Sequence, residues 1–245
     1  MHALLLREII TRFGRENLGV LWLVGEPMLF TLGIVTLWSM VAQHRGSSIP
    51  IVAFAVTGYS SVLLWRNCAT HAGGAIRENK TLLFHRYVRV IDVLLNRIVI
   101  EIGGATGSFI LLSLLFIYVG WMPQPSDLLE VISGWILLAW FGASLALLIG
   151  SATAFSEIVP RVWHPVSYIM FPISGAAFMV DWLPANLQKI VLLLPMVHGV
   201  EILREGYFGG VVPAHYDLGY MATCCLILSL TSLYVVHEAS RRVDF

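Results

Sequence analysis

Two short motifs in the sequence resemble sites of phosphate or metal chemistry, but neither is complete. Residues 74–81 read GAIRENKT, a phosphate-binding loop pattern with Asn79 in place of the second glycine. Backbone amides wrap a phosphate only when that glycine and a preceding strand are present, and here an apolar run precedes the motif. His198 and Glu201 fit one helix face, but no second histidine follows one turn later, as a zinc site would need. No Ser-His-Asp spacing is recognisable either. The sequence therefore predicts no cofactor in this chain and no enzyme.

Two carboxylates lie inside apolar runs, where an ionised group is costly. Glu26, followed by Pro27, lies in the first run, and Glu101 lies just inside the third. A charge within the bilayer costs at least about 2.5–3.5 kcal/mol, so each side chain should face a bundle interior, a partner or water. Glu101 is shallow enough to lie at the interface. Glu26 is the better functional candidate, although pairing with a basic residue near the N-terminus explains it equally well.

The composition places the chain in a membrane. Hydrophobic residues make up 58% of it and charged residues 12%, whereas soluble domains are about 45–50% apolar and about 25% charged. The 15 basic and 15 acidic residues balance, which excludes the strongly basic character of a nucleic-acid binder. The three cysteines have no metal-ligand spacing and are interpreted as small apolar residues.

The hydrophobic residues form six runs that predict six transmembrane helices. A helix needs about 20 mostly apolar residues to cross a bilayer. The runs are continuous, without a period of two, which favours helices over a membrane barrel. The second run is short and is expected to continue into residues 66–75. The prediction is an all-α membrane protein with one transmembrane domain, residues 1–245, and spans at 18–42, 51–65, 98–121, 131–155, 162–180 and 218–236.

Two further segments are predicted to lie at the membrane without crossing it. In residues 1–17, Leu, Ile and Phe recur at helical spacing opposite a charged face, as in an amphipathic interfacial helix. An ordinary solvated helix end is the alternative. Later in the chain, residues 186–194 and 195–208 are apolar but too short to cross, with Pro195 between them. We expect a re-entrant or interfacial hairpin at 183–216 on the outer side, because such backbone must be covered by protein or water.

The distribution of basic residues predicts the orientation. Lys and Arg collect in cytoplasmic loops of membrane proteins. With both termini in the cytoplasm, twelve basic residues lie inside, and only Arg45, Lys189 and Arg204 lie outside. The richest stretch is residues 66–97, with six basic residues between two apolar runs. We call it the coupling segment, because it is where a cytosolic partner is expected to bind.

Three stretches of the chain carry recognisable motifs. The first is Arg12-Phe13 with LGVLW at 18–22 and Glu26-Pro27, the second is residues 79–97, and the third and most specific is PMVHGVEILREGYFG at 195–209. Together they resemble the membrane permease subunit of type-2 ABC exporters, and in particular the branch that exports capsular polysaccharide. The first stretch is similar to that family's interfacial helix running into the first span, the second to its cytoplasmic coupling segment and the third to its outer hairpin.

The resemblance implies a homodimer in the bacterial inner membrane, assembled with two copies of a separate ATP-binding subunit that binds ATP and Mg. The implied substrate is a lipid-linked acidic glycan, and a periplasmic polysaccharide co-polymerase is a further implied partner. Aromatic side chains could then stack on sugars in or near a pore, with Trp135 and Trp140 among them. Anchoring at the membrane interface is the alternative role for such residues. The predicted translocation path contains Glu26, Trp38 and Tyr59.

The coupling segment contains an apolar stretch among polar residues, which suggests docking in a groove of the ATPase with a charged rim. Packing of the same residues against the bilayer is the alternative. The predicted coupling residues are Arg77, Glu78, Asn79, Leu82, Leu83, Phe84 and Arg86.

The outer hairpin contains a group of charges that is costly at membrane depth unless paired or wet. Glu201 and Arg204 lie one turn apart and are predicted to pair and to hold a closed gate. His198 is expected to be a weaker, pH-sensitive contributor and Glu205 a neighbour in the same gate. A static surface ion pair is the alternative.

Several rival functions share parts of this pattern. An ABC permease for O-antigen, teichoic acid, a drug or a lipid would have the same architecture. A non-ABC channel would have no use for the coupling segment. An intramembrane enzyme would need clustered catalytic groups, and only isolated carboxylates are present.

Overall fold

The computed structural model describes residues 7–8, 19–42, 49–83 and 88–243, and every regular element in these ranges is helical. The prediction of an all-α fold is confirmed for this part of the chain. Of the interfacial helix predicted at 1–17, only Arg7 and Glu8 are described, and both are helical. The helices are α2 (Gly19–Ala42), α3 (Ile51–Glu78), α4 (Lys80–Leu83), α5 (Val90–Val119), α6 (Leu128–Ala152), α7 (Ile158–Ile173), η1 (Val180–Trp182), α8 (Ala185–Val191), α9 (Pro195–Phe208) and α10 (Leu218–Val243).

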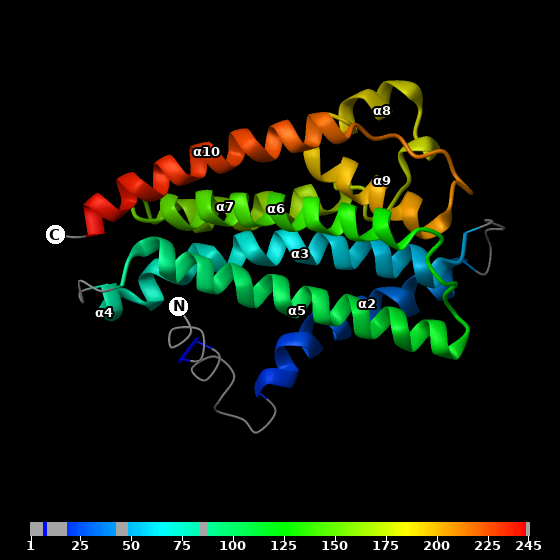
Figure 1. Ribbon diagram of the computed structural model, residues 1–245, viewed down its shortest axis with the longest axis horizontal. Coiled ribbons are helices and arrows are strands. Elements are labelled where there is room, and N and C mark those ends of the chain that lie inside the picture. The colour runs from blue at the N-terminus through cyan, green and yellow to red at the C-terminus, as the bar shows by residue number, and fades with distance from the viewer. Residues whose placement is uncertain (1–6, 9–18, 43–48, 84–87, 244–245) are drawn as a thin grey trace.

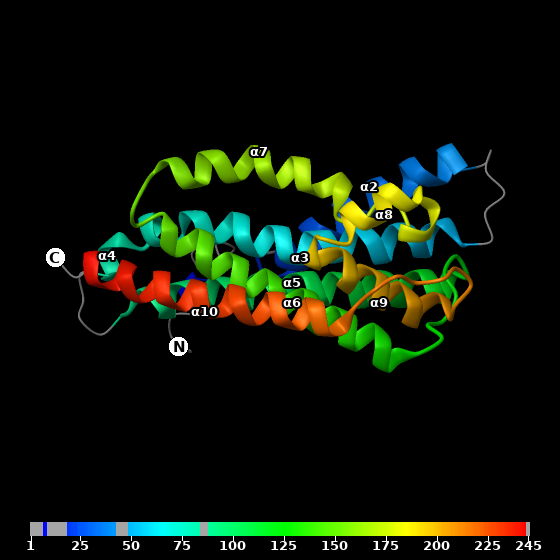
Figure 2. The ribbon, with the colours of Figure 1, turned by 90° about the horizontal axis from the view of Figure 1, so that it is seen from above.

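The long helices lie side by side along the molecule (Figure 1). Helix α3 is central in the bundle, since it packs against α2, α5, α6, α7 and α9. Figure 2 shows α7 and α10 on opposite sides of the layer that contains α3 and α6. The α4 helix and the last turn of α10 lie at one end of the bundle, while α8 and α9 lie at the other (Figure 1).

Glycines on α6 let its neighbours approach closely. A Cβ atom at Gly142 would lie 2.8 Å from the Trp65 Cα, and one at Gly134 would lie 2.7 Å from the Leu203 amide nitrogen. Small residues at such contacts are how membrane helices gain packing energy without a hydrophobic driving force. Helix α6 is thus held against α3 through one glycine and against α9 through another.

By length and composition, three of the described helices can cross a bilayer: α5, α6 and Leu218–Arg242 of α10. The pair α8 and α9 would make a fourth if two helices bent by 108° count as one span. Six spans were expected from the sequence. In the described part of the chain, three or four meet the criterion of length and apolar composition. Helix α3 continues beyond the predicted 66–75 extension to Glu78.

The span predicted at 162–180 is wrong in its boundaries. Helix α7 contains 16 residues and ends at Ile173. Pro172 cannot donate a backbone hydrogen bond, and Gly175 has a φ of 87°, a left-handed conformation that ends helices. Residues 174–179 therefore form irregular backbone before η1. Hydropathy alone missed this break because the residues after it are also apolar.

Candidate functional site

The coupling segment, residues 66–97, comprises the second half of α3, the short α4 and the start of α5, and its turn at α4 lies at one end of the bundle (Figure 1). Arg66, which the sequence analysis counted on the cytoplasmic side, instead lies level with the middle of α6, because the adjacent Trp65 packs against Gly142. Arg77, Glu78 and Lys80 are exposed there, and Leu82 is half-buried. Leu83 differs from the expectation of an exposed docking residue, since it is only 7% exposed. It packs in a cluster with residues of α3 and α5. Phe84 and Arg86 lie outside the described residues.

Asn79 has a local structural role in this segment. It follows the last residue of α3, and its backbone N–H donates to the carbonyl oxygen of Ala75. Its side-chain amide donates to the same carbonyl at 3.0 Å. A helix end leaves carbonyl groups without partners. Asn79 therefore caps α3 and fixes where the chain turns into α4.

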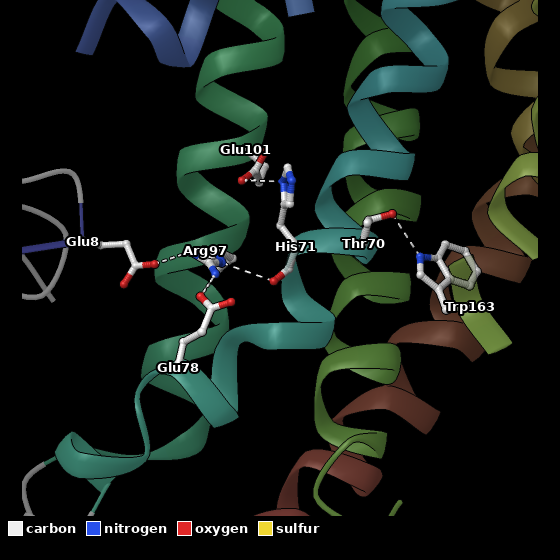
Figure 3. A network of polar contacts seen from close by, with 7 residues as sticks. All are labelled: Glu8, Thr70, His71, Glu78, Arg97, Glu101 and Trp163. Carbon is white, nitrogen blue, oxygen red and sulfur yellow. Dashed lines mark hydrogen bonds and ion pairs between the residues drawn. The ribbon is translucent and has the colours of Figure 1, made fainter. Parts of the chain in front are cut away.

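Arg97 links three segments that are far apart in the sequence (Figure 3). Its guanidinium donates to the carboxylates of Glu8 and Glu78, and its Nε donates to the His71 carbonyl oxygen at 3.2 Å. Arg97 is 2% exposed, and a buried guanidinium is tolerated when carboxylates and carbonyls satisfy it. This contact joins the N-terminal segment to the end of α3 through α5.

The sequence analysis counted Arg97 only among the basic residues that predict the orientation, and it missed this role. A usable signal was present, because Arg97 lies one turn before Glu101 at the start of an apolar helix. Glu101 is buried, and its Oε1 lies 2.8 Å from Nδ1 of His71 (Figure 3). Of the environments expected for Glu101, which were a bundle interior, a partner, water or the membrane interface, the structure shows burial beside His71 of α3.

The predicted path residues lie in different environments. Glu26 is exposed on α2, so within this chain it does not face the bundle interior. Tyr59 is buried on α3, and its ring lies 6.4 Å from the Phe30 ring and 5.2 Å from the Phe171 ring. The side chain of Trp38 lies outside the described residues.

The other two candidate pore tryptophans bind neighbouring helices. The indole N–H of Trp135 donates to the Thr106 hydroxyl at 3.0 Å, and that of Trp140 donates to the Ser229 hydroxyl at 2.9 Å. Both tryptophans belong to α6, and their partners belong to α5 and α10. These hydrogen bonds assign the two indoles to helix packing.

At the opposite end, α9 is almost entirely enclosed by other parts of the chain. It meets α8 at an angle of 108°, which agrees with a pair of short helices broken at Pro195. Pro195 is the first residue of α9 and Gly209, with a φ of 61°, follows its last. These are the residue types that start and stop helices. The break therefore follows from the local sequence.

Arg204 of α9 is completely buried and binds backbone carbonyls (0% exposed). Its Nη1 donates to the carbonyl oxygens of Gly175 and Phe178, both at 2.6 Å, and its Nη2 donates to that of Ala176 at 2.8 Å. The guanidinium also lies 4.0 Å from the centre of the Phe54 ring on α3. Arg204 thus satisfies the irregular backbone that follows α7.

Glu201 binds backbone N–H groups one turn earlier on the same helix. Its two carboxylate oxygens accept from the backbone N–H groups of Val180 and His215, each at 3.2 Å. Among the described residues, Glu201 and Arg204 form no direct ion pair, contrary to the sequence expectation. Both side chains instead hydrogen-bond to backbone groups that no regular helix satisfies. Loss of these hydrogen bonds would cost more free energy than loss of a surface ion pair.

His198 uses both ring nitrogens in hydrogen bonds to backbone. The Asp217 backbone N–H can only donate, so Nδ1 accepts from it at 2.9 Å. The Leu192 carbonyl can only accept, so Nε2 donates to it at 2.8 Å. His198 therefore bridges the end of α8 and the start of α10.

Glu205 lies half-buried on α9 and has a different environment from Glu201. Its Oε2 is buried without a hydrogen-bond partner in the described part of the chain. The Tyr216 hydroxyl, in the loop after α9, hydrogen-bonds to the Glu205 carboxylate, which with desolvation raises the pKa of Tyr216 to about 12. The four predicted gate residues thus share one helix, but they contact different partners.

The chain matches known proteins over nearly its whole length. CtrC, a capsule polysaccharide export inner-membrane protein of Neisseria meningitidis, is 43% identical over 242 residues, which cover 99% of this chain and 91% of CtrC. BexB, a capsule polysaccharide export inner-membrane protein of Haemophilus influenzae, is 38% identical over 244 residues, or 100% and 92% of the two chains. KpsM, a polysialic acid transport protein of Escherichia coli, is 27% identical over 234 residues, or 93% and 88%.

The family model described as ABC-2 type transporter matches residues 1–208, which include the coupling segment and α9. The matched region covers most of the chain, and the relatives above extend the similarity past it. The resemblance drawn from the sequence is therefore confirmed at the level of the family. This chain belongs to the ABC-2 type transporter family.

Proposed function

We propose that this chain is the membrane-spanning subunit of an ATP-driven exporter that moves a lipid-linked capsular polysaccharide across the inner membrane. The observation that carries the proposal is the full-length similarity to CtrC and BexB. Both are capsule polysaccharide export inner-membrane proteins. Family membership supports dependence on an ATP-binding partner, and the apolar helices support a membrane location.

In this proposal, two copies of the chain assemble with two copies of a separate ATP-binding subunit, which binds ATP and Mg. A periplasmic co-polymerase receives the acidic glycan on the other side. Both chain termini lie in the cytoplasm. The position of α4 and the last turn of α10 at one end of the bundle supports the assignment of the coupling segment and the C-terminus to the same side (Figure 1).

The coupling segment is proposed to bind the ATP-binding subunit through its exposed residues. Arg77, Glu78 and Lys80 offer charges to a partner, and Leu82 is the half-exposed one of the two predicted docking leucines. Arg97 ties Glu78 to Glu8, so a movement of the segment would reach the N-terminal segment. Leu83 supports the segment from within.

The end of the bundle that contains α9 is proposed to close the outer end of the path. Glu201 and Arg204 hold residues 175–180 and the backbone of His215 against α9. These segments are not tied by regular helix hydrogen bonds, so they can rearrange if the two side chains release them. Passage of the polymer would supply that change.

The function itself is tested by deletion of the gene for this chain. Without the permease, polysaccharide should remain inside the cell, and surface polysaccharide should fall to background when both pools are measured on the same culture. Expression of the chain from a plasmid should restore it. Normal surface polysaccharide in the deletion strain would refute the proposed function.

A matched pair of substitutions tests the coupling segment. Leu82→Asp should weaken co-purification of the ATP-binding subunit at least tenfold and leave the melting temperature of the chain unchanged, because Leu82 is half-exposed. Leu83→Asp should lower the melting temperature of the chain by several degrees, because it places a charge in the packed α3–α5 cluster. Equal co-purification of wild type and Leu82→Asp would exclude docking through this residue.

The gate is tested by Glu201→Gln, which keeps the shape of the side chain but removes its charge and one acceptor oxygen. We expect the exporter to assemble, with ATP hydrolysis raised severalfold relative to the polysaccharide exported. Asp181→Asn is the control, since Asp181 is an outer carboxylate whose contact is with the exposed ring of His215. Wild-type export and hydrolysis in Glu201→Gln would show that the residue has no gating role.

A further inference from the structure

Arg66 places a positive charge level with the middle of α6, a helix that can cross the membrane. The residue before it, Trp65, has its Cα 2.8 Å from the position of a Cβ at Gly142. Gly142 is the fifteenth of the 25 residues of α6, a helix long and apolar enough to cross the bilayer. At 1.5 Å per residue, Gly142 lies about 21 Å from one end of α6 and about 15 Å from the other. The side chain of Arg66 therefore extends from α3 at a level close to the middle of α6.

The guanidinium of Arg66 lies on aromatic rings. Its Cζ is 4.5 Å from the centre of the Tyr168 ring and 5.8 Å from that of Phe171, both on α7. Among the residues that the structure describes, no carboxylate forms an ion pair with Arg66. This is unlike Arg97 and Arg204, whose guanidinium groups donate hydrogen bonds to oxygen atoms. A cation in a membrane span normally pairs or marks a substrate pathway.

The aromatic rings continue from Arg66 toward the opposite end of α3. Tyr59 precedes Arg66 by two helical turns, so both residues lie on one face of α3. The ring of Tyr59 lies 5.2 Å from that of Phe171 and 6.4 Å from that of Phe30 on α2. Tyr168 is 61% exposed and Phe30 is 45% exposed. The rings therefore form a stripe that begins beside Arg66, and the rings at its two ends, Tyr168 and Phe30, are exposed.

We propose that Arg66, together with the rings of Tyr168, Phe171 and Tyr59, binds an anionic saccharide at the middle of the membrane. The guanidinium would pair with a carboxylate or phosphate of the saccharide, for which its planar fork is well matched. The rings would pack against the C–H faces of sugar rings. This inference rests on the proposed function and identifies where the charge of the substrate is recognised.

The arrangement favours a sugar acid over the two simpler ligands. A neutral saccharide would use the rings and leave the cation without a counter-charge. A phospholipid headgroup would supply the anion, but it belongs at the membrane surface, about 15 Å from the bilayer centre. A ligand with both an anionic group and sugar faces satisfies the cation and the rings together.

The test uses the complex of the chain with its ATP-binding subunit in phosphatidylcholine nanodiscs. The probes are a fluorescent sialic-acid oligomer and a neutral maltodextrin oligomer of equal length, and binding is followed by fluorescence anisotropy. Arg66→Gln should weaken binding of the acidic oligomer about tenfold or more, since it removes a charged hydrogen bond, and leave the neutral oligomer unchanged. Arg66→Lys should restore part of the loss, and Tyr168→Ala should weaken both oligomers.

Arg242→Gln is the matched control, because Arg242 also lies over an aromatic ring, that of Phe155 at 4.7 Å, but at the end of α10. It should change neither affinity. Unchanged binding of the acidic oligomer in Arg66→Gln, an equal loss for both oligomers, or no preference for the acidic oligomer in the wild type would overturn the proposal. Stabilisation of the wild type by phosphatidylglycerol that disappears in Arg66→Gln, without an effect on saccharide binding, would assign the anion to lipid instead and would also overturn it.

Measurements of surface polysaccharide in cells distinguish this inference from the proposed function. If deletion of the chain abolishes surface polysaccharide while Arg66→Gln exports it normally and binds the acidic oligomer normally, only the role of Arg66 fails. If deletion leaves the surface polysaccharide intact, the proposed function fails as well.

Discussion

The hydrogen bonds from Arg204 to the carbonyl oxygens of residues 175, 176 and 178 are the contacts on which one half of the fold depends. Backbone that leaves a helix inside a membrane has no water to satisfy it, so another part of the protein must do so. Arg204 supplies the donors, and Glu201 supplies acceptors for nearby N–H groups. Gly58 of α3 makes the approach possible, since a Cβ there would lie 2.4 Å from the Ala176 oxygen.

A second buried arginine has a similar role at the opposite end of the bundle. Arg97 joins Glu78, the last residue of α3, to Glu8 near the N-terminus (Figure 3). Helix α3 begins near Arg204, which lies over the ring of Phe54. Helix α3 is therefore tied at each end by a guanidinium to segments that are distant in the sequence. Arg66 lies between the two on α3, and its contacts among the described residues are with aromatic rings alone.

The sequence predicted the parts of the fold that depend on local pattern. Apolar runs predicted the long helices, and Pro195 predicted the start of α9. The termination of α7 was missed because Gly175 and its left-handed backbone lie within a run that remains apolar. Similarity to a family was also readable, since motifs such as LGVLW and PMVHGVEILREGYFG are local.

The partners of the buried charges could not be predicted in the same way. Helical spacing put Glu201 next to Arg204, but both residues bind backbone from segments about 20 to 30 residues earlier and from residue 215, and only the tertiary fold brings these together. The sequence analysis named His198 as a gate residue but could not show that its ring binds the backbone of residues 192 and 217. Contacts of this kind depend on long-range packing, which no periodicity encodes.

The most direct test of this account is the thermal unfolding of the purified chain with Arg204→Met and Arg204→Lys. Methionine fills similar space but donates no hydrogen bond, and each buried carbonyl left without a donor costs about 1–3 kcal/mol. Lysine keeps the charge but cannot reach three carbonyls with a planar fork. The account predicts a large fall in melting temperature for methionine and only partial recovery for lysine. A methionine variant that melts with the wild type would contradict it.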